Sequence, residues 1–327
     1  MENKLRKSVL RIPLFFAKLT HIFLPNYILL PFLTSIKKIP YGSKIIMCFD
    51  PNLIRKIYKF NLKPREFELK GKDWKLILNI RDHIGFISYV RQKPFEMCVY
   101  HVANKLQESK RNIVIDLGAN IGTASIPICS IKDYELIAIE PSKENASILL
   151  KNVFLNNLKS KIYICALVEK IDKKYKKLFI NHGNTGANSI IKGWSPSLKS
   201  LDSQQFEYVE SRSFDQIIDH GQVEINDVLI VKIDVEGMEE LVLKGSSNFL
   251  KLNTAPIILE YRRDISLKYL EKDLKSITEL LEDYHYSIYS LNKNGNLGNF
   301  DLTKKYENII ALKNNSPLNK NLLIDNL

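Results

Sequence analysis

The sequence predicts an α/β fold with a doubly wound, mostly parallel sheet of seven strands and an antiparallel edge hairpin, preceded by a helical and α/β extension. Short apolar runs at residues 113–115, 135–140 and 227–233 are typical of buried parallel strands. Stretches of helical character follow these runs, and such alternation favours a parallel sheet. A glycine-rich turn over residues 116–122 joins the first run to its helix. Together these three observations place a ligand-binding α/β core in the middle of the chain.

The N-terminal residues 1–40 form a segment rich in basic and large apolar residues. The 327-residue chain has 48 Lys and Arg against 36 Asp and Glu, and residues 1–70 hold 14 of the former but only 4 of the latter. In a helix over residues 4–24, four cations would share one face and large apolar side chains another. The segment is expected to cap the domain or to lie in the plane of a membrane, as a peripheral contact at its inner face. A transmembrane span or a cleaved signal is the least favoured alternative, because Pro25, Asn26 and Pro31 interrupt the uncharged stretch over residues 19–36.

Residues 41–107 are expected to form an α/β adaptor. Strands are predicted at residues 44–48 and 74–80, and helices at residues 51–60 and 95–106. The four cysteines of the chain are scattered, with no C-x-x-C pair. This spacing argues against zinc and against a disulfide framework, and it fits a reducing, cytoplasmic compartment.

Residues 108–315 are expected to form the core domain. Further strands are predicted at residues 162–168, 206–211, 256–260, 286–291 and 308–312. Helices are predicted at residues 123–129, 142–156, 214–219, 239–250 and 265–283. Residues 178–190 resemble an inserted hairpin, and the last two strands would pair across the Asn294-Gly295 turn. Residues 316–327, rich in Asn, are expected to be a mobile tail.

The turn after the first core strand has the pattern D-x-G-x-N-x-G, formed by Asp116, Gly118, Asn120 and Gly122. Glycine lets the backbone approach a ligand closely, and the following helix offers free N–H groups. The related dinucleotide pattern G-x-G-x-x-G binds a pyrophosphate, which an aspartate here would repel. S-adenosylmethionine (SAM) carries an ammonium group and no phosphate. The turn therefore indicates a SAM site, with Asp116 facing the ammonium directly or through water.

Glu140 at the end of the next apolar strand supports this interpretation. A carboxylate at that position can bind both hydroxyls of a ribose. The adenine is then expected between the residues that follow, beginning with Pro141, and those near Ala166.

Asp234 and Glu236 are the candidate catalytic residues. They follow the strand over residues 227–233, at the edge of the sheet where ligands bind. A hydroxyl is a poor nucleophile until a nearby carboxylate can take its proton. In the structural alternative, Asp234 caps the next helix and Glu236 binds Lys232. A third possibility, in which these carboxylates and Glu260 hold Mg²⁺, has no reinforcing histidine pair or carboxylate–asparagine pair, so no metal site is assigned.

These motifs together resemble the FkbM family of SAM-dependent methyltransferases. The block from Lys232 to Gly237, K-I-D-V-E-G, is the most specific of them, and the resemblance covers residues 95–260. It implies a class I methyltransferase fold and O-methylation of a hydroxyl on a sugar, glycan, glycolipid or secondary metabolite. The implied cofactor is SAM.

The resemblance extends to four single residues outside the main motifs. Glu96, after Phe95, is similar to the family's aromatic–Glu pair before the first core helix and is implied to contact the cofactor. Asn152 and Asn156 resemble the family's N-x-x-x-N helix end, and Asp215 its T-L-D aspartate.

Three other functions compete with this one. A nucleic-acid methyltransferase would carry an N/D-P-P-Y block where this chain has K-I-D-V-E-G, and the nearly neutral core does not suit a polyanion. An NAD-dependent sugar oxidoreductase is disfavoured by Asp116. A non-catalytic SAM-binding scaffold is disfavoured because the motif positions are intact. The expected partner is a small-molecule or glycan acceptor and not nucleic acid; the sequence indicates neither its identity nor the oligomeric state.

Overall fold

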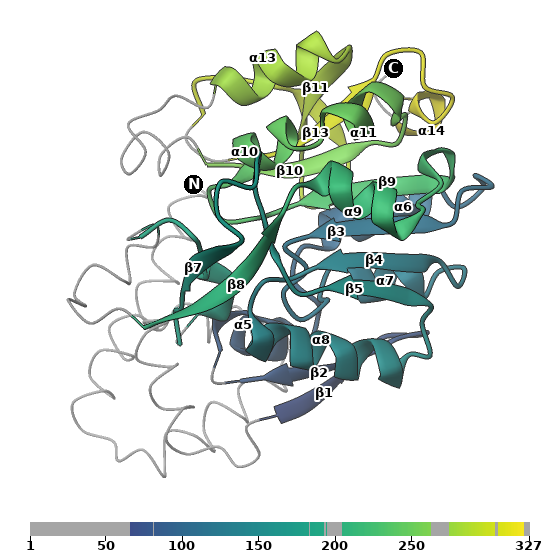
Figure 1. Cartoon of the computed structure of the whole chain (residues 1–327). Helices are drawn as coiled ribbons and strands as arrows, with labels where there is room; N and C mark the ends of the chain where they lie inside the picture. Colours follow the sequence, from purple (N-terminus) through teal and green to yellow (C-terminus); the bar gives the residue numbers. More distant parts are fainter. Residues whose placement is uncertain are drawn as a thin grey trace, which may run out of the picture. The chain divides into compact units, whose positions relative to one another are not determined.

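A computed structural model describes residues 66–80, 82–182, 184–192, 194, 205–262, 275–304 and 307–323 (Figure 1). The basic segment over residues 1–40, the strand predicted at residues 44–48 and the helix predicted at residues 51–60 lie outside these described residues. Within the described part of the chain, no helix is both long enough and apolar enough to cross a bilayer.

The chain divides into two compact units, and the division differs from the predicted domains. The larger unit contains residues 70–77 and everything from Pro94 onward. Helix α6 (Met97–Lys105), predicted as part of the adaptor, therefore belongs to the larger unit. Of the described residues, the smaller unit holds 66–69 and 78–93, including helix α5 (His83–Arg91).

Two short strands lie at the start of the described chain. β1 (Glu66–Lys70) pairs with β2 (Lys75–Asn79) in a two-stranded sheet, which confirms the predicted strand at residues 74–80. Helix α5 begins after Asp82, whose carboxylate accepts a hydrogen bond from the Ile84 N–H at 2.8 Å. This is ordinary N-capping by an aspartate.

The larger unit is built on an eight-stranded sheet of order β12-β11-β13-β10-β9-β3-β4-β5. Its strands are β3 (Ile113–Leu117), β4 (Glu135–Ile139), β5 (Ser160–Tyr163), β9 (Val228–Ile233), β10 (Ile257–Tyr261), β11 (Tyr286–Leu291), β12 (Leu297–Asn299) and β13 (Glu307–Lys313). The five strands from β10 to β5 are parallel, and β13 joins them antiparallel. The predicted doubly wound α/β class with an antiparallel edge is confirmed.

The edge of the sheet differs from the prediction in one strand. The Asn294-Gly295 turn joins β11 to β12, which pair from Tyr289 with Asn299 to Leu291 with Leu297. β11 also pairs with β13. The three-residue β12 is thus an eighth strand that the predicted seven-stranded sheet lacked, because three residues are too few for periodicity to reveal.

Helices cover both faces of this sheet (Figure 1). Helices α6 and α7 (Ser125–Cys129) pack over β3, β4 and β9 on one face. On the other face, Ile113, Ile115 and Leu117 pack in a core with residues of α9 (Phe214–Gly221), α10 (Glu239–Lys244), α11 (Ser247–Leu252) and α13 (Lys275–Asp283). Because strand residues alternate between faces, Asp116 points toward α6 and α7.

Three predicted elements are divided or shifted. The strand predicted at residues 162–168 splits into β5 and β6 (Ala166–Leu167), which lie in different sheets. The helix predicted at residues 239–250 breaks between α10 and α11, where a Cβ on Gly245 would lie 2.4 Å from the Val168 carbonyl oxygen. Residues 319–323, predicted as part of a mobile tail, form helix α14 (Asn319–Leu323) with Leu322 buried.

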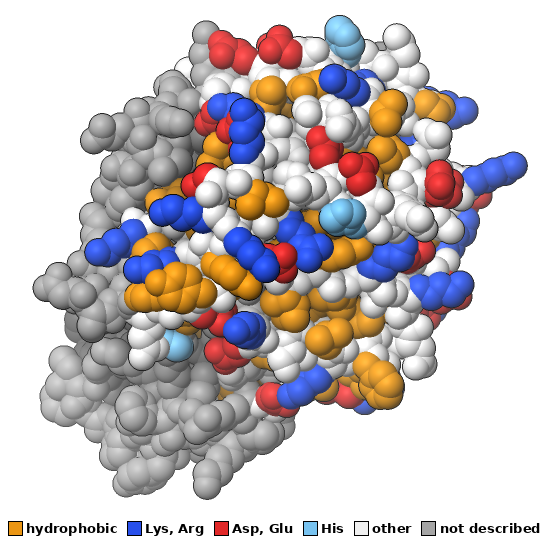
Figure 2. Space-filling view, viewed as in Figure 1, with side chains coloured by type: hydrophobic (Ala, Val, Ile, Leu, Met, Phe, Trp, Pro, Cys, Tyr) orange, Lys and Arg blue, Asp and Glu red, His pale blue; other side chains and the backbone are white. Residues whose placement is uncertain are grey.

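An inserted three-stranded sheet, β6-β8-β7, stands apart from the main sheet. β7 (Tyr175–Phe179) pairs antiparallel with β8 (Phe206–Arg212), confirming a strand at residues 206–211. The hairpin predicted at residues 178–190 is reduced to a single bridge between Phe179 and Ser189. Apolar side chains and lysines lie side by side over β7 and β8, where Lys177 Nζ is 4.3 Å from the centre of the Phe206 ring (Figure 2).

Candidate functional site

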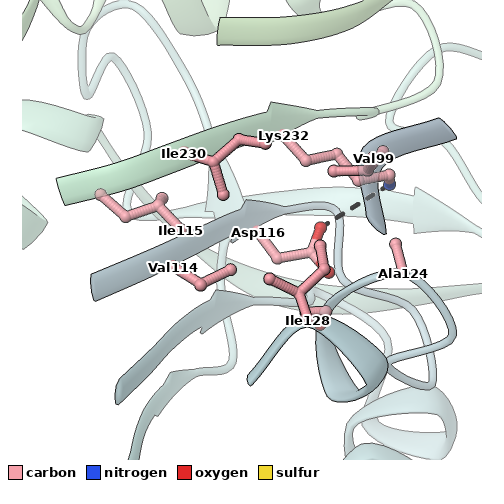
Figure 3. Close-up of a pocket in the computed structure, with 9 residues that line it drawn as sticks. Val99, Val114, Ile115, Asp116, Ala124, Ile128, Ile230 and Lys232 are labelled. Carbon is pink, nitrogen blue, oxygen red and sulfur yellow. Dashed lines mark ion pairs between the residues drawn. The ribbon is translucent and has the colours of Figure 1, made fainter. Parts of the chain in front are cut away.

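The order of the strands brings Asp116 and Lys232 together. β3 and β9 are neighbours in the sheet although 110 residues separate them in the chain, and their register pairs Asp116 with Lys232. Both side chains are buried and project to the same face, toward α6 and α7 (Figure 3). The space beside them is lined mainly by apolar side chains, among them Val99 and Ile128.

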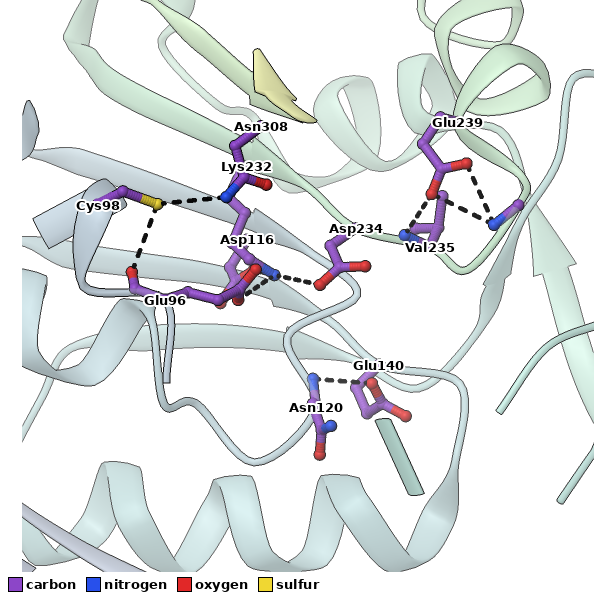
Figure 4. Close-up of polar contacts among 11 residues, drawn as sticks. Glu96, Cys98, Asp116, Asn120, Glu140, Lys232, Asp234, Val235, Glu239 and Asn308 are labelled. Carbon is purple, nitrogen blue, oxygen red and sulfur yellow. Dashed lines mark hydrogen bonds and ion pairs between the residues drawn. The ribbon is translucent and has the colours of Figure 1, made fainter. Parts of the chain in front are cut away.

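The Lys232 ammonium contacts three carboxylates (Figure 4). Its Nζ atom lies 3.2 Å from Glu96 Oε2, 3.2 Å from Asp234 Oδ2 and 3.6 Å from Asp116 Oδ1. Burial alone would lower the pKa of Lys232, but the charges of Asp234, Glu96 and Asp116 outweigh burial and raise it well above its usual range. Lys232 is thus a buried cation that contacts both Asp116, the cofactor-binding candidate on β3, and Asp234, the catalytic candidate after β9.

Glu96 is the residue directly before α6, and its side chain belongs to this cluster. Its backbone is left-handed, with φ of 58°, and its carboxylate is mostly buried. Burial raises the pKa of Glu96 to about 7, Lys232 opposes the shift, and Asp234 and Asp116 add to it. The family resemblance implied a cofactor contact for Glu96; in the structure its carboxylate forms an ion pair with Lys232.

The glycine turn is shaped by the protein's own backbone. Gly118 has φ of +82°, and a Cβ there would lie 1.8 Å from the Asp234 carbonyl oxygen. Any side chain at position 118 would therefore push the loop after β9 away. Gly122 also has positive φ, and its Cβ would meet the side chains of Ile126 and Leu149. Asn120 adopts φ of 51°, a conformation that asparagine tolerates better than most residues.

Glu140 is hydrogen-bonded to the glycine turn. Its Oε2 accepts a hydrogen bond from the Asn120 N–H at 2.9 Å (Figure 4), and its Oε1 accepts from the Ser142 N–H at 2.9 Å and the Asn145 side-chain amide at 3.3 Å. Burial raises the pKa of Glu140 to about 7 against these hydrogen bonds, which lower it. Oε2 accepts only one hydrogen bond from the described residues, so it retains capacity for a ligand hydroxyl.

The other two predicted cofactor residues lie in different surroundings. Pro141 follows Glu140 and is half-buried before α8 (Lys143–Leu155), whose N-cap is Ser142 as predicted. Ala166 is buried in β6, where it packs with Leu178 and Val209 of the inserted sheet.

Three buried oxygens of the turn accept no hydrogen bond from any described residue. They are both carboxylate oxygens of Asp116 and the side-chain oxygen of Asn120. A buried oxygen without a donor is costly, typically by about 1–3 kcal/mol. Asp116 Oδ1 has the Lys232 ammonium at 3.6 Å, whereas Asp116 Oδ2 and the Asn120 oxygen have no partner among the described residues. These two atoms fit a ligand that supplies hydrogen-bond donors, as an ammonium group does.

Glu236 is held by residues from the inserted segment. The Trp194 indole N–H donates to Glu236 Oε2 at 2.9 Å, and the Ser189 hydroxyl donates to the Glu236 carbonyl at 2.7 Å. Burial, followed by the charges of Asp234 and Glu260, raises the pKa of Glu236 well above its usual range. The structural alternative is wrong in both details, because Lys232 contacts Asp234 rather than Glu236, and no side chain caps α10.

Two further carboxyls lie near the loop after β9, the buried Glu239 and the half-buried Glu260. Glu239 accepts hydrogen bonds from the Val235 and Gly237 N–H groups, which holds the loop closed. Burial raises its pKa to about 7, and burial and Asp234 raise that of Glu260, on β10, to about 8. Among the described residues, no group of three or more His, Cys, Asp and Glu side chains is arranged to hold a metal ion.

The sequence indicated some of these contacts but not others. Lys232 interrupts an otherwise apolar strand, and a charged residue in such a strand must find a partner. The contact of Trp194 with Glu236 and the hydrogen bonds of Glu239 to the loop after β9 had no such signal. Asp215 caps α11 by accepting from the Asn248 and Phe249 N–H groups, so its position is explained by structure alone.

The raised carboxyl pKa values predict an unusual pH dependence of stability. Glu96, Glu140 and Glu239 have a pKa of about 7 and Glu260 of about 8, against 4.5 ordinarily. Between these values the unfolded chain releases protons that the folded chain retains, so the free energy of unfolding should fall as pH rises from 4.5 to 8. One such group corresponds to a loss of about 3 kcal/mol.

Urea unfolding of the ligand-free protein at pH 5 and pH 8 measures this fall. Glu140→Gln should show a smaller fall than the unmodified chain, because one titrating group is gone. Equal or greater stability at pH 8 would contradict the prediction.

One protein-family model matches the chain, described as "Methyltransferase FkbM domain", over residues 116–288. No curated protein matches the sequence.

Several solved structures show similarity at low identity. The FkbM methyltransferase from Methylobacillus flagellatus KT is 15% identical over 62% of this chain, with a TM-score of 0.39, and the chain spans 43% of its length. A putative caffeoyl-CoA O-methyltransferase from Staphylococcus aureus is 10% identical, covering 80% of this chain and 98% of that one, with a TM-score of 0.40. M. jannaschii TYW2 in complex with AdoMet is 12% identical, covering 76% and 85%, with a TM-score of 0.37. At these values the likenesses identify no acceptor.

Proposed function

Because this chain belongs to the FkbM methyltransferase family, whose model matches more than half of its length, we propose that it transfers a methyl group from SAM to a hydroxyl group of a small molecule or glycan. The family membership supports methyl transfer. The SAM site and the hydroxyl acceptor rest on the arrangement of the acidic side chains.

The observation that carries the cofactor is the hydrogen bond between the glycine turn and Glu140. The Asn120 N–H holds Glu140 Oε2 at the carboxyl end of β4, beside the buried oxygens of Asp116 at the end of β3. Asp116 would hold the ammonium group of SAM and Glu140 its ribose hydroxyls. When bound, SAM supplies an electrophilic methyl group on a sulfonium. The turn would hold it at the strand ends, where open α/β sheets bind ligands.

Asp234 is the group that we assign as the proton acceptor. Its Oδ2 contacts Lys232, while its Oδ1 accepts no hydrogen bond from the described residues. The pKa of Glu236 lies well above its usual range and that of Glu260 is about 8, partly because of the Asp234 charge, so both carboxyls keep their protons more readily than an ordinary glutamate does. Asp234 thus takes the acceptor's hydroxyl proton at Oδ1, and Lys232 keeps its carboxylate oriented.

The acceptor is proposed to be a sugar, glycan, glycolipid or secondary metabolite rather than nucleic acid. Four carboxyls gather around the loop after β9, namely Asp234, Glu236, Glu239 and Glu260. Nucleic-acid binding depends on cations that neutralise the phosphates, and carboxyls rather than cations predominate around this loop.

The cofactor assignment predicts that Glu140→Ala binds SAM at least about tenfold more weakly, which corresponds to 1.4 kcal/mol. The loss follows because the ribose contact and the Asn120 N–H partner disappear together. Calorimetry measures both proteins, with Glu144→Ala, an exposed glutamate in the first turn of α8, as control. Unchanged affinity in Glu140→Ala would overturn the site, and thermal stabilisation by NAD but not by SAM would favour an oxidoreductase.

The place of the enzyme in the cell is a separate proposal. The basic residues 1–40 lie outside the described residues, and we expect them to hold a cytoplasmic enzyme on the inner face of a membrane. Near an anionic leaflet each cation contributes roughly 1 kcal/mol. The full chain should float with anionic liposomes in low salt and less in high salt. A chain that stays at the bottom of the gradient in both would indicate that the segment caps the protein instead.

A further inference from the structure

The helix α8 carries two asparagines, Asn152 and Asn156, whose side chains form hydrogen bonds to the backbone of β2 as a neighbouring strand would. The Asn152 side chain accepts from the Ile77 N–H at 2.6 Å and donates to the Ile77 carbonyl at 3.2 Å. Asn156 does the same with Lys75, at 2.8 Å and 2.6 Å. Each side-chain amide thus forms the pair of hydrogen bonds that a strand would form.

The spacing of the two asparagines explains why a helix can do this. Four residues along an α-helix rise by about 6 Å. Two residues along a β-strand rise by about 6.7 Å. Asn152 and Asn156 are therefore spaced like Lys75 and Ile77, alternate residues on one edge of β2.

The hydrogen bonds of the two asparagine side chains differ only in the third one. Asn156 donates its second N–H to the Asn152 carbonyl of its own helix at 2.7 Å. Asn152 instead donates at 2.8 Å to the carbonyl of Ile121, inside the glycine turn. Asn152 is fully buried, so this contact has no competition from water.

This contact determines the orientation of one peptide group in the turn. The carbonyl of Ile121 points to Asn152, and the N–H of the same peptide group, on Gly122, donates to the Ala119 carbonyl at 2.8 Å. The peptide group is therefore held at both ends. It lies next to Asn120, whose own N–H holds Glu140.

We propose that Asn152 is a positioning residue for the cofactor site, which it couples to the β2 edge at Ile77 by holding the Ile121 carbonyl. It does not touch the cofactor itself. The proposal rests on the proposed SAM site, because it concerns the turn that would hold SAM. Asn156, which makes the same strand contacts without touching the turn, has no such role.

The matched variants Asn152→Ala and Asn156→Ala test this. Each removes two hydrogen bonds to β2, but only Asn152→Ala releases the turn. We expect SAM affinity, measured by calorimetry, to fall about fivefold or more for Asn152→Ala relative to Asn156→Ala, as loss of one well-placed buried hydrogen bond would give. Urea unfolding of both variants shows how far general destabilisation contributes. Equal SAM affinities for the two variants would overturn the proposal.

Asn152→Asp keeps the acceptor for the Ile77 N–H but, when ionised, cannot donate to Ile121, and it replaces Asn152→Ala if that variant does not fold. Its control is Asn156→Asp. Hydrogen exchange of the Asn120 and Gly122 amides, without ligand, gives a readout independent of SAM. These amides should exchange faster in the Asn152 variants than in the Asn156 variants. If the unmodified protein fails to bind SAM, the proposed function fails, while the exchange rates still support or overturn the role of Asn152.

Discussion

Asp234→Asn is expected to bind SAM like the unmodified protein and to transfer methyl on the order of a hundredfold more slowly or worse. The amide is close in shape to the carboxylate and keeps an oxygen for Lys232, whose Nζ lies 3.2 Å from Asp234 Oδ2. The asparagine amide cannot take the proton of the substrate hydroxyl, which we assign to Asp234 Oδ1. Single-turnover transfer of a labelled methyl group, with SAM affinity measured in parallel, separates chemistry from binding.

The control for this variant is Asp219→Asn, which changes an exposed aspartate of α9 away from the site. Near-normal turnover in Asp234→Asn would remove Asp234 from the mechanism, and Glu236→Gln would then be the variant to compare. Activity that disappears with EDTA and returns with Mg²⁺ would point instead to a metal held by these carboxylates.

Lys232→Met is expected to destabilise the folded protein by about 3–5 kcal/mol, because it leaves buried carboxylates without their cation. Glu96, Asp116 and Asp234 all lie within 3.6 Å of the ammonium, and the Lys232 side chain is only 7% exposed. Methionine fills a similar volume, so lost charge rather than lost packing dominates the change. Urea unfolding at pH 8 measures the loss.

The matched control is Lys244→Met, which removes an ion pair with Glu240 at 2.6 Å on the surface of α10. The Lys244 side chain of this pair is 37% exposed, and ion pairs that reach the solvent in this way contribute about 0–1 kcal/mol. The difference between the two variants should shrink at pH 5, where Glu96, with a pKa of about 7, is protonated. Equal losses for both variants at pH 8 would show that the buried cluster does not depend on Lys232.

Patterns within short stretches of sequence predicted much of the fold and part of the site. The apolar runs gave β3, β4 and β9 to within one or two residues, and Ser142 caps α8 as predicted. The D-x-G-x-N-x-G turn and Glu140 lie at adjacent strand ends and are joined by a hydrogen bond. These features depend on periodicity and on turn chemistry, which neighbouring residues encode.

Where a predicted element was wrong, a partner distant in the chain was responsible. β6 leaves the main sheet because Ala166 and Leu167 pair with β8. The helix after β9 breaks where Gly245 lies against the Val168 carbonyl. Helix α14 is ordered because Leu318 and Leu322 are buried, although its Asn- and Lys-rich sequence resembles a mobile tail.

The sequence by itself determined the α/β class, the family motifs and the acidic residues at the strand ends. Only the tertiary structure decided what those residues contact. Lys232 meets Glu96 and Asp116 because β9 lies beside β3 out of chain order, and Asn152 meets Ile121 because α8 packs beside the turn. Ion pairs and hydrogen bonds between distant residues follow from strand order and register, which no local periodicity encodes.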